Sequence, residues 1–138
     1  MACSLANRYP VNNCRIDQPD FTSTGRHPAN DLSPKCLARI GARTIDEEGQ
    51  RLFVVDSPNN RILVFDIHQD GLTNDLEAVA VIGQPDFTSG TPGIGPAKFS
   101  GVSCLAYDPV LKRLFAADRD NHLVLVFDVD PKQPNRMK

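Results

Sequence analysis

The sequence predicts an all-β fold of the β-propeller type, in which four-stranded antiparallel sheets, called blades, follow one another along the chain. Three observations lead to this prediction. The segment RLFVVDSPNNRILVFDI at residues 51–67 returns as RLFAADRDNHLVLVFDV at residues 113–129, an offset of 113 − 51 = 62. The hexapeptide QPDFTS occurs at residues 18–23 and again at 84–89. The apolar runs are too short for helices and are rich in the β-branched and aromatic residues that suit strands.

The repeated segment reads as a β-hairpin. Its first copy has two apolar runs, Leu52–Val55 and Ile62–Phe65, on either side of the polar stretch DSPNN. Asp and Asn bond to neighbouring backbone and Pro presets φ, so this stretch predicts a turn. Neither run alternates between apolar and polar residues, as a strand with one face in water would. We therefore expect these strands to be covered on both faces, as in stacked sheets.

The other strands of each unit follow from the same alignment. Leu37–Asp46 aligns with Phe99–Asp108 at the offset of 62, and each predicts a first strand that ends at an Asp-led turn. Ala78–Ile82 predicts a fourth strand that leads into the second QPDFTS. A β-sandwich is the competing interpretation, but it gives no reason for the fixed order of the repeated segments.

The repeat divides the chain into five parts. Residues 1–34 form an N-terminal segment with a remnant strand and the first linker, and residues 35–84 form the first blade. A linker at 85–97 leads to a second blade at 98–129, which lacks its fourth strand, and residues 130–138 form a polar tail. About two blades do not close a ring of four to eight. We expect a fragment of a larger propeller, self-assembly that closes the ring, or a two-sheet monomer with altered packing.

Composition and charge exclude several classes. The net charge is −2 with acids and bases interspersed, so nucleic acid is not an expected partner. The chain has the composition of a soluble protein and no apolar run that could span a membrane. The N-terminus does not resemble a signal peptide, which indicates a cytoplasmic protein if that terminus is native. The four cysteines show no metal-ligand spacing, so neither a metal nor a cofactor is expected, and Cys104 in its apolar strand is expected to be buried.

The turns between the second and third strands are expected to lie at the same end as the linkers between blades, because the strands are antiparallel. This rim is the predicted contact surface for a protein or small ligand, although Asp56 and Asp118 also fit a structural role as acceptors of backbone N–H groups, with Asn59 and Asn121 left-handed. The candidate contact residues are Asp56, Asn59, Asn60, Arg61, Asp118, Asp120, Asn121 and His122.

The two linkers are given a structural role, since a connection that repeats the same mechanical task would keep its sequence. Proline stiffens the exit from the fourth strand, Phe87 is expected to wedge between blades, and Asp86 or Thr88 to satisfy free amides. The linker residues are Gln18, Pro19, Asp20, Phe21, Gln84, Pro85, Asp86 and Phe87.

The repeat resembles the NHL-repeat β-propeller family. The residues that carry the resemblance in the second unit are Gly101-Val102, Asp108, Leu114–Asp118 and Val126-Phe127. Those in the first are Leu52–Asp56, Asn59, Arg61-Ile62 and Val64-Phe65, and Leu123 stands where the first unit has Arg61. The resemblance implies a non-catalytic binding scaffold. The alternative is part of a metal-dependent propeller hydrolase or lyase, but His27, His68 and His122 fall in different loops and no catalytic motif is present, so no enzyme activity is expected.

Overall fold

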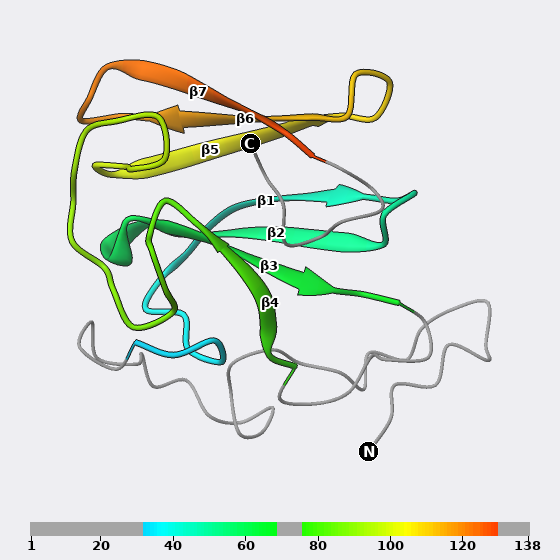
Figure 1. Cartoon of the computed structure of the whole chain (residues 1–138), viewed down its shortest axis with the longest axis horizontal. Helices are drawn as coiled ribbons and strands as arrows, with labels where there is room; N and C mark the ends of the chain where they lie inside the picture. The colour runs from blue at the N-terminus through cyan, green and yellow to red at the C-terminus, as the bar shows by residue number, and fades with distance from the viewer. Residues whose placement is uncertain (1–31, 69–75, 130–138) are drawn as a thin grey trace.

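In its described residues the chain forms two antiparallel β-sheets with almost no helix, which confirms the all-β prediction. The computed structural model describes residues 32–68 and 76–129, and in this part the strands follow the repeat (Figure 1). The first sheet has the order β1 (Ile40–Asp46), β2 (Arg51–Asp56), β3 (Arg61–Asp66) and β4 (Ala78–Ile82), with a short 3-10 turn η1 (Ser57–Asn59) between β2 and β3. The second sheet has the order β5 (Val102–Asp108), β6 (Arg113–Asp118) and β7 (Leu123–Asp128).

Strand positions agree with the sequence except at the start of each unit. The hairpin strands and β4 lie where they were predicted, and each first strand ends at its Asp. However, β1 and β5 begin three residues later than expected, at Ile40 rather than Leu37 and at Val102 rather than Phe99. In both copies the carboxylate of the last residue of the second strand accepts a hydrogen bond from the segment before the first strand, Ala38 N to Asp56 and Ser100 N to Asp118. The backbone at these positions is therefore engaged by a side chain instead of by a neighbouring strand.

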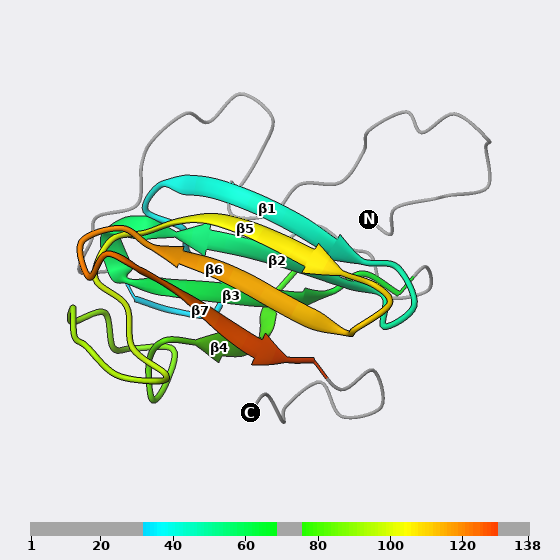
Figure 2. The same ribbon diagram turned by 90° about the horizontal axis from the view of Figure 1, so that it is seen from above.

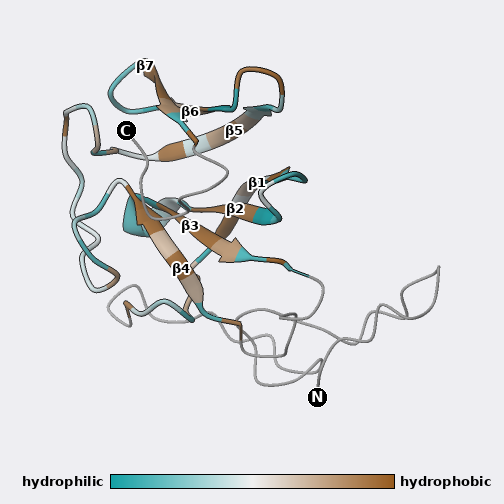
Figure 3. Cartoon of the chain, turned by 45° about the vertical axis from the view of Figure 1, so that its right-hand side comes forward, coloured by the Kyte–Doolittle hydropathy of each residue, from teal (hydrophilic) through white to brown (hydrophobic). Residues whose placement is uncertain are grey.

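The two sheets stack face to face, and the main apolar core lies between them. The strands of the second sheet run along those of the first, with β5 against β1 and β2 (Figure 2). Figure 3 shows the hydrophobic residues concentrated on the strands and in the β5–β6 turn, and the hydrophilic ones at η1 and in the β1–β2 and β6–β7 turns. The core residues are Phe53, Val55, Ile62, Val64 and Ile82 from the first sheet, and Phe99, Val102, Leu114, Ala116, Phe127 and Val129 from the second repeat.

The hairpin strands of the first sheet, β2 and β3, are covered on both faces, as expected from their missing alternation. On its face away from the second sheet lies another buried apolar cluster of Leu37, Val54, Leu63, Phe65 and Ala78. The expectation of two covered faces is wrong for the second sheet. There β7 has the burial pattern of a strand with one open face, and Val124 and Val126 are exposed.

The link between the sheets depends on a glycine. Gly83, directly after β4, has φ +92°, and a Cβ at this position would lie 2.2 Å from a ring atom of Phe99. Phe99 is fully buried and packs edge-on against Phe127, with ring centroids 5.9 Å apart. The chain thus turns sharply after β4 and brings the aromatic residue of the next repeat into the core. The predicted remnant strand, the first QPDFTS with Gln18, Pro19, Asp20 and Phe21, and the polar tail lie outside the described residues.

Candidate interaction surface

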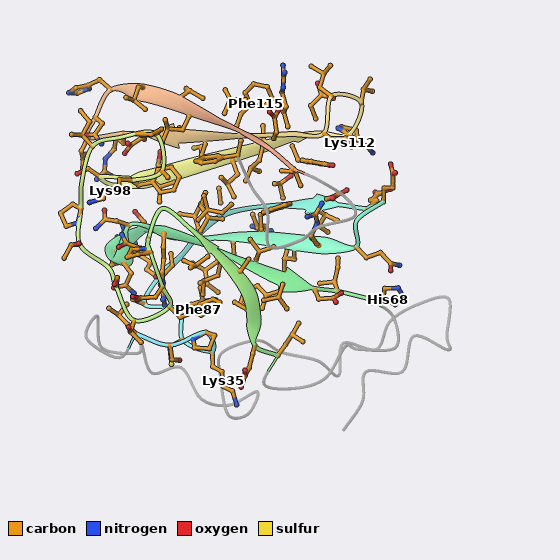
Figure 4. The ribbon with its side chains drawn as sticks, in the orientation of Figure 1. Lys35, His68, Phe87, Lys98, Lys112 and Phe115 are labelled. Atoms are coloured by element: carbon orange, nitrogen blue, oxygen red, sulfur yellow. The ribbon has the colours of Figure 1, made fainter. Side chains whose placement is uncertain are left out.

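The predicted rim exists at one end of the two sheets. The β2–β3 turn, the β6–β7 turn and the linker after β4 lie together at the left of Figure 1. Hydrogen bonds join both turns to the linker: Gln84 Nε2 donates to Asn60 O over 3.0 Å, and Asn121 Nδ2 donates to Gly93 O over 2.8 Å. His68 lies at the opposite end (Figure 4), as expected for a residue that follows the third strand. The prediction that the turns share one rim with the linkers is confirmed for the second linker, and the first lies outside the described residues.

The first-copy turn is buried at this rim. Asp56 and Arg61 are both fully buried and form an ion pair, Arg61 Nε to Asp56 Oδ2, over 2.9 Å. The other guanidinium nitrogens of Arg61 donate to backbone carbonyls of distant segments: Nη1 to Phe87 O over 2.7 Å, and Nη2 to Cys36 O over 2.8 Å. Asn59 Nδ2 donates to the same Asp56 oxygen over 2.8 Å. These side chains hold the loops around the turn in place.

Asn60 connects the two repeats. Its Nδ2 donates to Gly90 O over 3.1 Å, and its Oδ1 accepts from the Gly101 N–H, at the start of the second unit, over 2.9 Å. Asn60 also holds the left-handed conformation of the turn, with φ 51°. This conformation was expected at Asn59 and Asn121. It falls one residue later in both copies, at Asn60 after the 3-10 turn η1 and at its counterpart His122, with φ 57°, at the end of the turn over residues 119–122. The structure therefore places all four first-copy candidates, Asp56, Asn59, Asn60 and Arg61, in the interior.

The second-copy turn is only partly buried. Asp118 repeats the role of Asp56, since its two carboxylate oxygens accept from Ser100 N over 2.7 Å and from Asn121 Nδ2 over 2.7 Å. Asp120 and His122 are exposed. Arg119 donates to Asp120 over 2.8 Å and holds the pKa of that carboxyl below its ordinary value. Asp120 and His122 are thus the predicted contact residues that the described structure leaves accessible at the rim.

The second linker is held by its own side chains. Asp86 Oδ1 accepts from Thr88 N, Thr88 Oγ1 and Ser89 Oγ over 2.8–2.9 Å, as expected for a turn-forming carboxylate. These hydroxyl and amide donors hold the pKa of Asp86 below its usual range. The expected position of Phe87 between the sheets is wrong. It packs against the apolar cluster on the other face of the first sheet, and Phe99 takes the place between the sheets.

The outer face of the second sheet is a feature that the sequence reasoning missed. Residues directly opposite one another on neighbouring antiparallel strands share a face. The register pairs Cys104 with Ala117, Ala106 with Phe115, Ala117 with Val124, and Phe115 with Val126. We call these six residues the open face; the label of Phe115 in Figure 4 lies on the side of the second sheet away from the first. The prediction of a buried Cys104 is wrong because its side chain lies on this face and is exposed.

The repeat shows what the open face would look like when covered. Val124 and Val126 are 59% and 50% exposed, whereas Ile62 and Val64, their counterparts in the first sheet, are 0% exposed beneath the second sheet. Counting the repeats could have revealed this face, because the chain shows one following repeat for the first sheet and none for the second among its described residues. The strand residues alone could not, since they are nearly the same in both copies.

The other end of the molecule contains a buried ion pair and a shallow cleft. Arg51 Nη2 donates to Asp46 Oδ2 over 2.6 Å, and Tyr107 of the second sheet lies beside this pair. Burial and the neighbouring Asp46 carboxylate raise the pKa of Tyr107 to about 12. The cleft, of about 620 Å³, is lined by Ile45, Glu47, Glu48, Tyr107, Pro109 and Lys112, with Lys112 paired to Glu48.

Comparison with known proteins gives no assignment. No family model matches the chain, and no curated protein matches it significantly. In residues 32–68 and 76–129, no three His, Cys, Asp or Glu side chains come together in an arrangement that could hold a metal ion. In the same part of the chain, no helix is long and apolar enough to cross a membrane.

Proposed function

We propose that this chain is a non-catalytic repeat module of β-propeller-type blades, similar to the NHL family, that acts as a protein-binding scaffold. The two sheets would then be blades of a larger propeller, or of an assembly of chains that completes one. The stacking of the two repeats supports it, because each repeat places the same strands in the same order and packs one face on its neighbour.

One observation carries the binding role. The open face combines exposed aliphatic residues with a rim that bears Asp120 and His122, whereas the equivalent face of the first sheet is buried. Contiguous exposed apolar side chains with polar residues at their border are typical of protein–protein interfaces. A protein partner is therefore favoured over a small ligand, which would require a concave pocket.

Site-specific photo-crosslinking tests the proposal. Benzoylphenylalanine is placed at Val124 on the open face, at His122 on the rim, and at Val110, which is 85% exposed in the turn at the opposite end. After irradiation in the cells from which the chain comes, we expect discrete protein adducts at Val124 and His122 and none at Val110. The same adducts at all three positions, or none at any, would contradict the proposed role.

A further inference from the structure

The edge of β7 away from β6 is a copy of an edge that the first sheet uses for strand pairing. The sequence of β3 is RILVFD and that of β7 is LVLVFD, so their last four residues are identical. In the first sheet β3 pairs with β2 on one side and with β4 on the other. In the second sheet β7 pairs with β6, and none of the described strands pairs with its other side. Nearly the same strand sequence thus has a partner strand on this side in the first repeat and, among the residues that the structure describes, none in the second.

The hydrogen-bond pattern shows which backbone groups point to this edge. Val129 N donates to Lys112 O over 2.8 Å beside the β6–β7 pairing. Because hydrogen-bonded and non-hydrogen-bonded pairs alternate along an antiparallel ladder, Phe127 and Leu125 bond to β6, while Val126 and Val124 direct their N–H and C=O groups away from it. Ile67 N donates to Gln50 O in the same way in the first sheet.

The partner of β3 defines the kind of strand that fits. The alternation directs the backbone groups of Ile62 and Val64 toward β4, where they pair with Ile82 and Ala80. Phe65, the counterpart of Phe127, pairs with the small residue Ala78 at a bulge. A strand that fits β7 would therefore carry a small residue beside Phe127 and aliphatic residues further along, as the AVAVI sequence of β4 does.

We infer that β7 binds an extended segment of a partner polypeptide by strand addition, antiparallel to β7 and of the AVAVI type. This inference deepens the proposed function and rests on it. Main-chain hydrogen bonds from Val124 and Val126 would supply the affinity, and the small residue beside Phe127 would supply the selectivity. The added strand would also extend the open face by one strand.

The test uses the full chain and a synthetic peptide, LEAVAVIGQ, which has the sequence of residues 76–84. Two N-methylated peptides provide matched controls. In one peptide the backbone nitrogen of the residue equivalent to Ala80 is methylated, which removes an N–H donor that faces β7. In the other the backbone nitrogen of the residue equivalent to Val81 is methylated, and this N–H group faces away from β7. In the chain, Val126→Pro removes a donor at the open edge but no hydrogen bond to β6, and proline is tolerated at such edge positions.

We expect saturable binding of the unmodified peptide by calorimetry, similar binding of the Val81-methylated peptide, and at least about tenfold weaker binding of the Ala80-methylated peptide. Val126→Pro should weaken binding to the same extent with an unchanged circular dichroism spectrum. Equal binding of all peptides, or no binding, would overturn the inference. Self-association of the free chain that Val126→Pro abolishes would assign the edge to a second copy and would also overturn it. Crosslinks at Val124 together with no peptide binding would refute strand addition and leave the proposed scaffold intact.

Discussion

At the scale of single residues, Arg61 shows how one buried side chain can hold several loop segments together. Its buried guanidinium pairs with Asp56 and binds carbonyl groups of segments 25 to 28 residues away in the sequence. Its counterpart Leu123 is 37% exposed, and the carboxylate of Asp118 opposite it accepts from Ser100 N and Asn121 Nδ2 without an arginine. The same position in the repeat therefore has a large structural role in one copy and a small one in the other.

Arg61→Leu should accordingly destabilise the chain by about 3–5 kcal/mol, because it leaves the carboxylate of Asp56 buried without its charged partner. The matched change Leu123→Arg should alter the free energy of unfolding by less than about 0.5 kcal/mol, since the side chain reaches solvent. Urea denaturation of both variants measures the difference. A loss below about 1 kcal/mol for Arg61→Leu would mean that Arg61 does not organise the rim.

Asp46 should make the fold sensitive to acid. Burial alone would raise its pKa, but hydrogen bonds from the Gly49 N–H and from Arg51 outweigh burial and hold the pKa below the ordinary value of 3.8. A lowered pKa in the folded state contributes stability that is present above the unfolded value and is lost as the pH falls below about 4 toward the folded value. Urea midpoints measured from pH 7 to pH 2.5 should therefore fall less steeply for Asp46→Asn than for the unchanged chain. Asp66→Asn, at an exposed strand end, is the control, and a steeper fall in Asp46→Asn would contradict the expectation.

At the scale of the elements, the hairpins could be predicted because the residues that specify their strands and turns are neighbours in the sequence. β-Branched runs and a turn of Asp, Pro and Asn specify β2, η1 and β3 without reference to the rest of the chain. The starts of β1 and β5 were missed because the carboxylates that engage the preceding backbone, Asp56 and Asp118, are each 18 residues away in the sequence.

The candidate site was predictable in position but not in exposure. The end of the sheets where the turns and linker meet follows from antiparallel topology. Whether a turn residue there is buried depends on which segments cover it, as the comparison of Asn60 with His122 shows. The open face and the open edge of β7 were missed for the same reason, because β3 and β7 are nearly identical in sequence and differ only in what lies next to them.

At the scale of the whole molecule, the contact between the two sheets is a template for how one repeat covers another. The face of β2 and β3 that bears Phe53 and Ile62 is buried beneath the second sheet. The outer face of the second sheet bears the equivalent positions, where Val124 is exposed and Phe115 is partly buried. The stability of the described structure therefore depends on the interface between the sheets and much less on the open face.

Matched alanine substitutions at two equivalent positions test this difference. Ile62→Ala should cost about 2–5 kcal/mol, because it creates a cavity in the core between the sheets. Val124 is the counterpart of Ile62 in the second repeat. Val124→Ala should cost less than about 1 kcal/mol, a value that allows for the lower strand propensity of alanine. Chemical denaturation at low protein concentration measures both values. A similar loss at the two positions would show that the open face is already covered in the free chain, and the open face and the edge of β7 would then not be available to a partner.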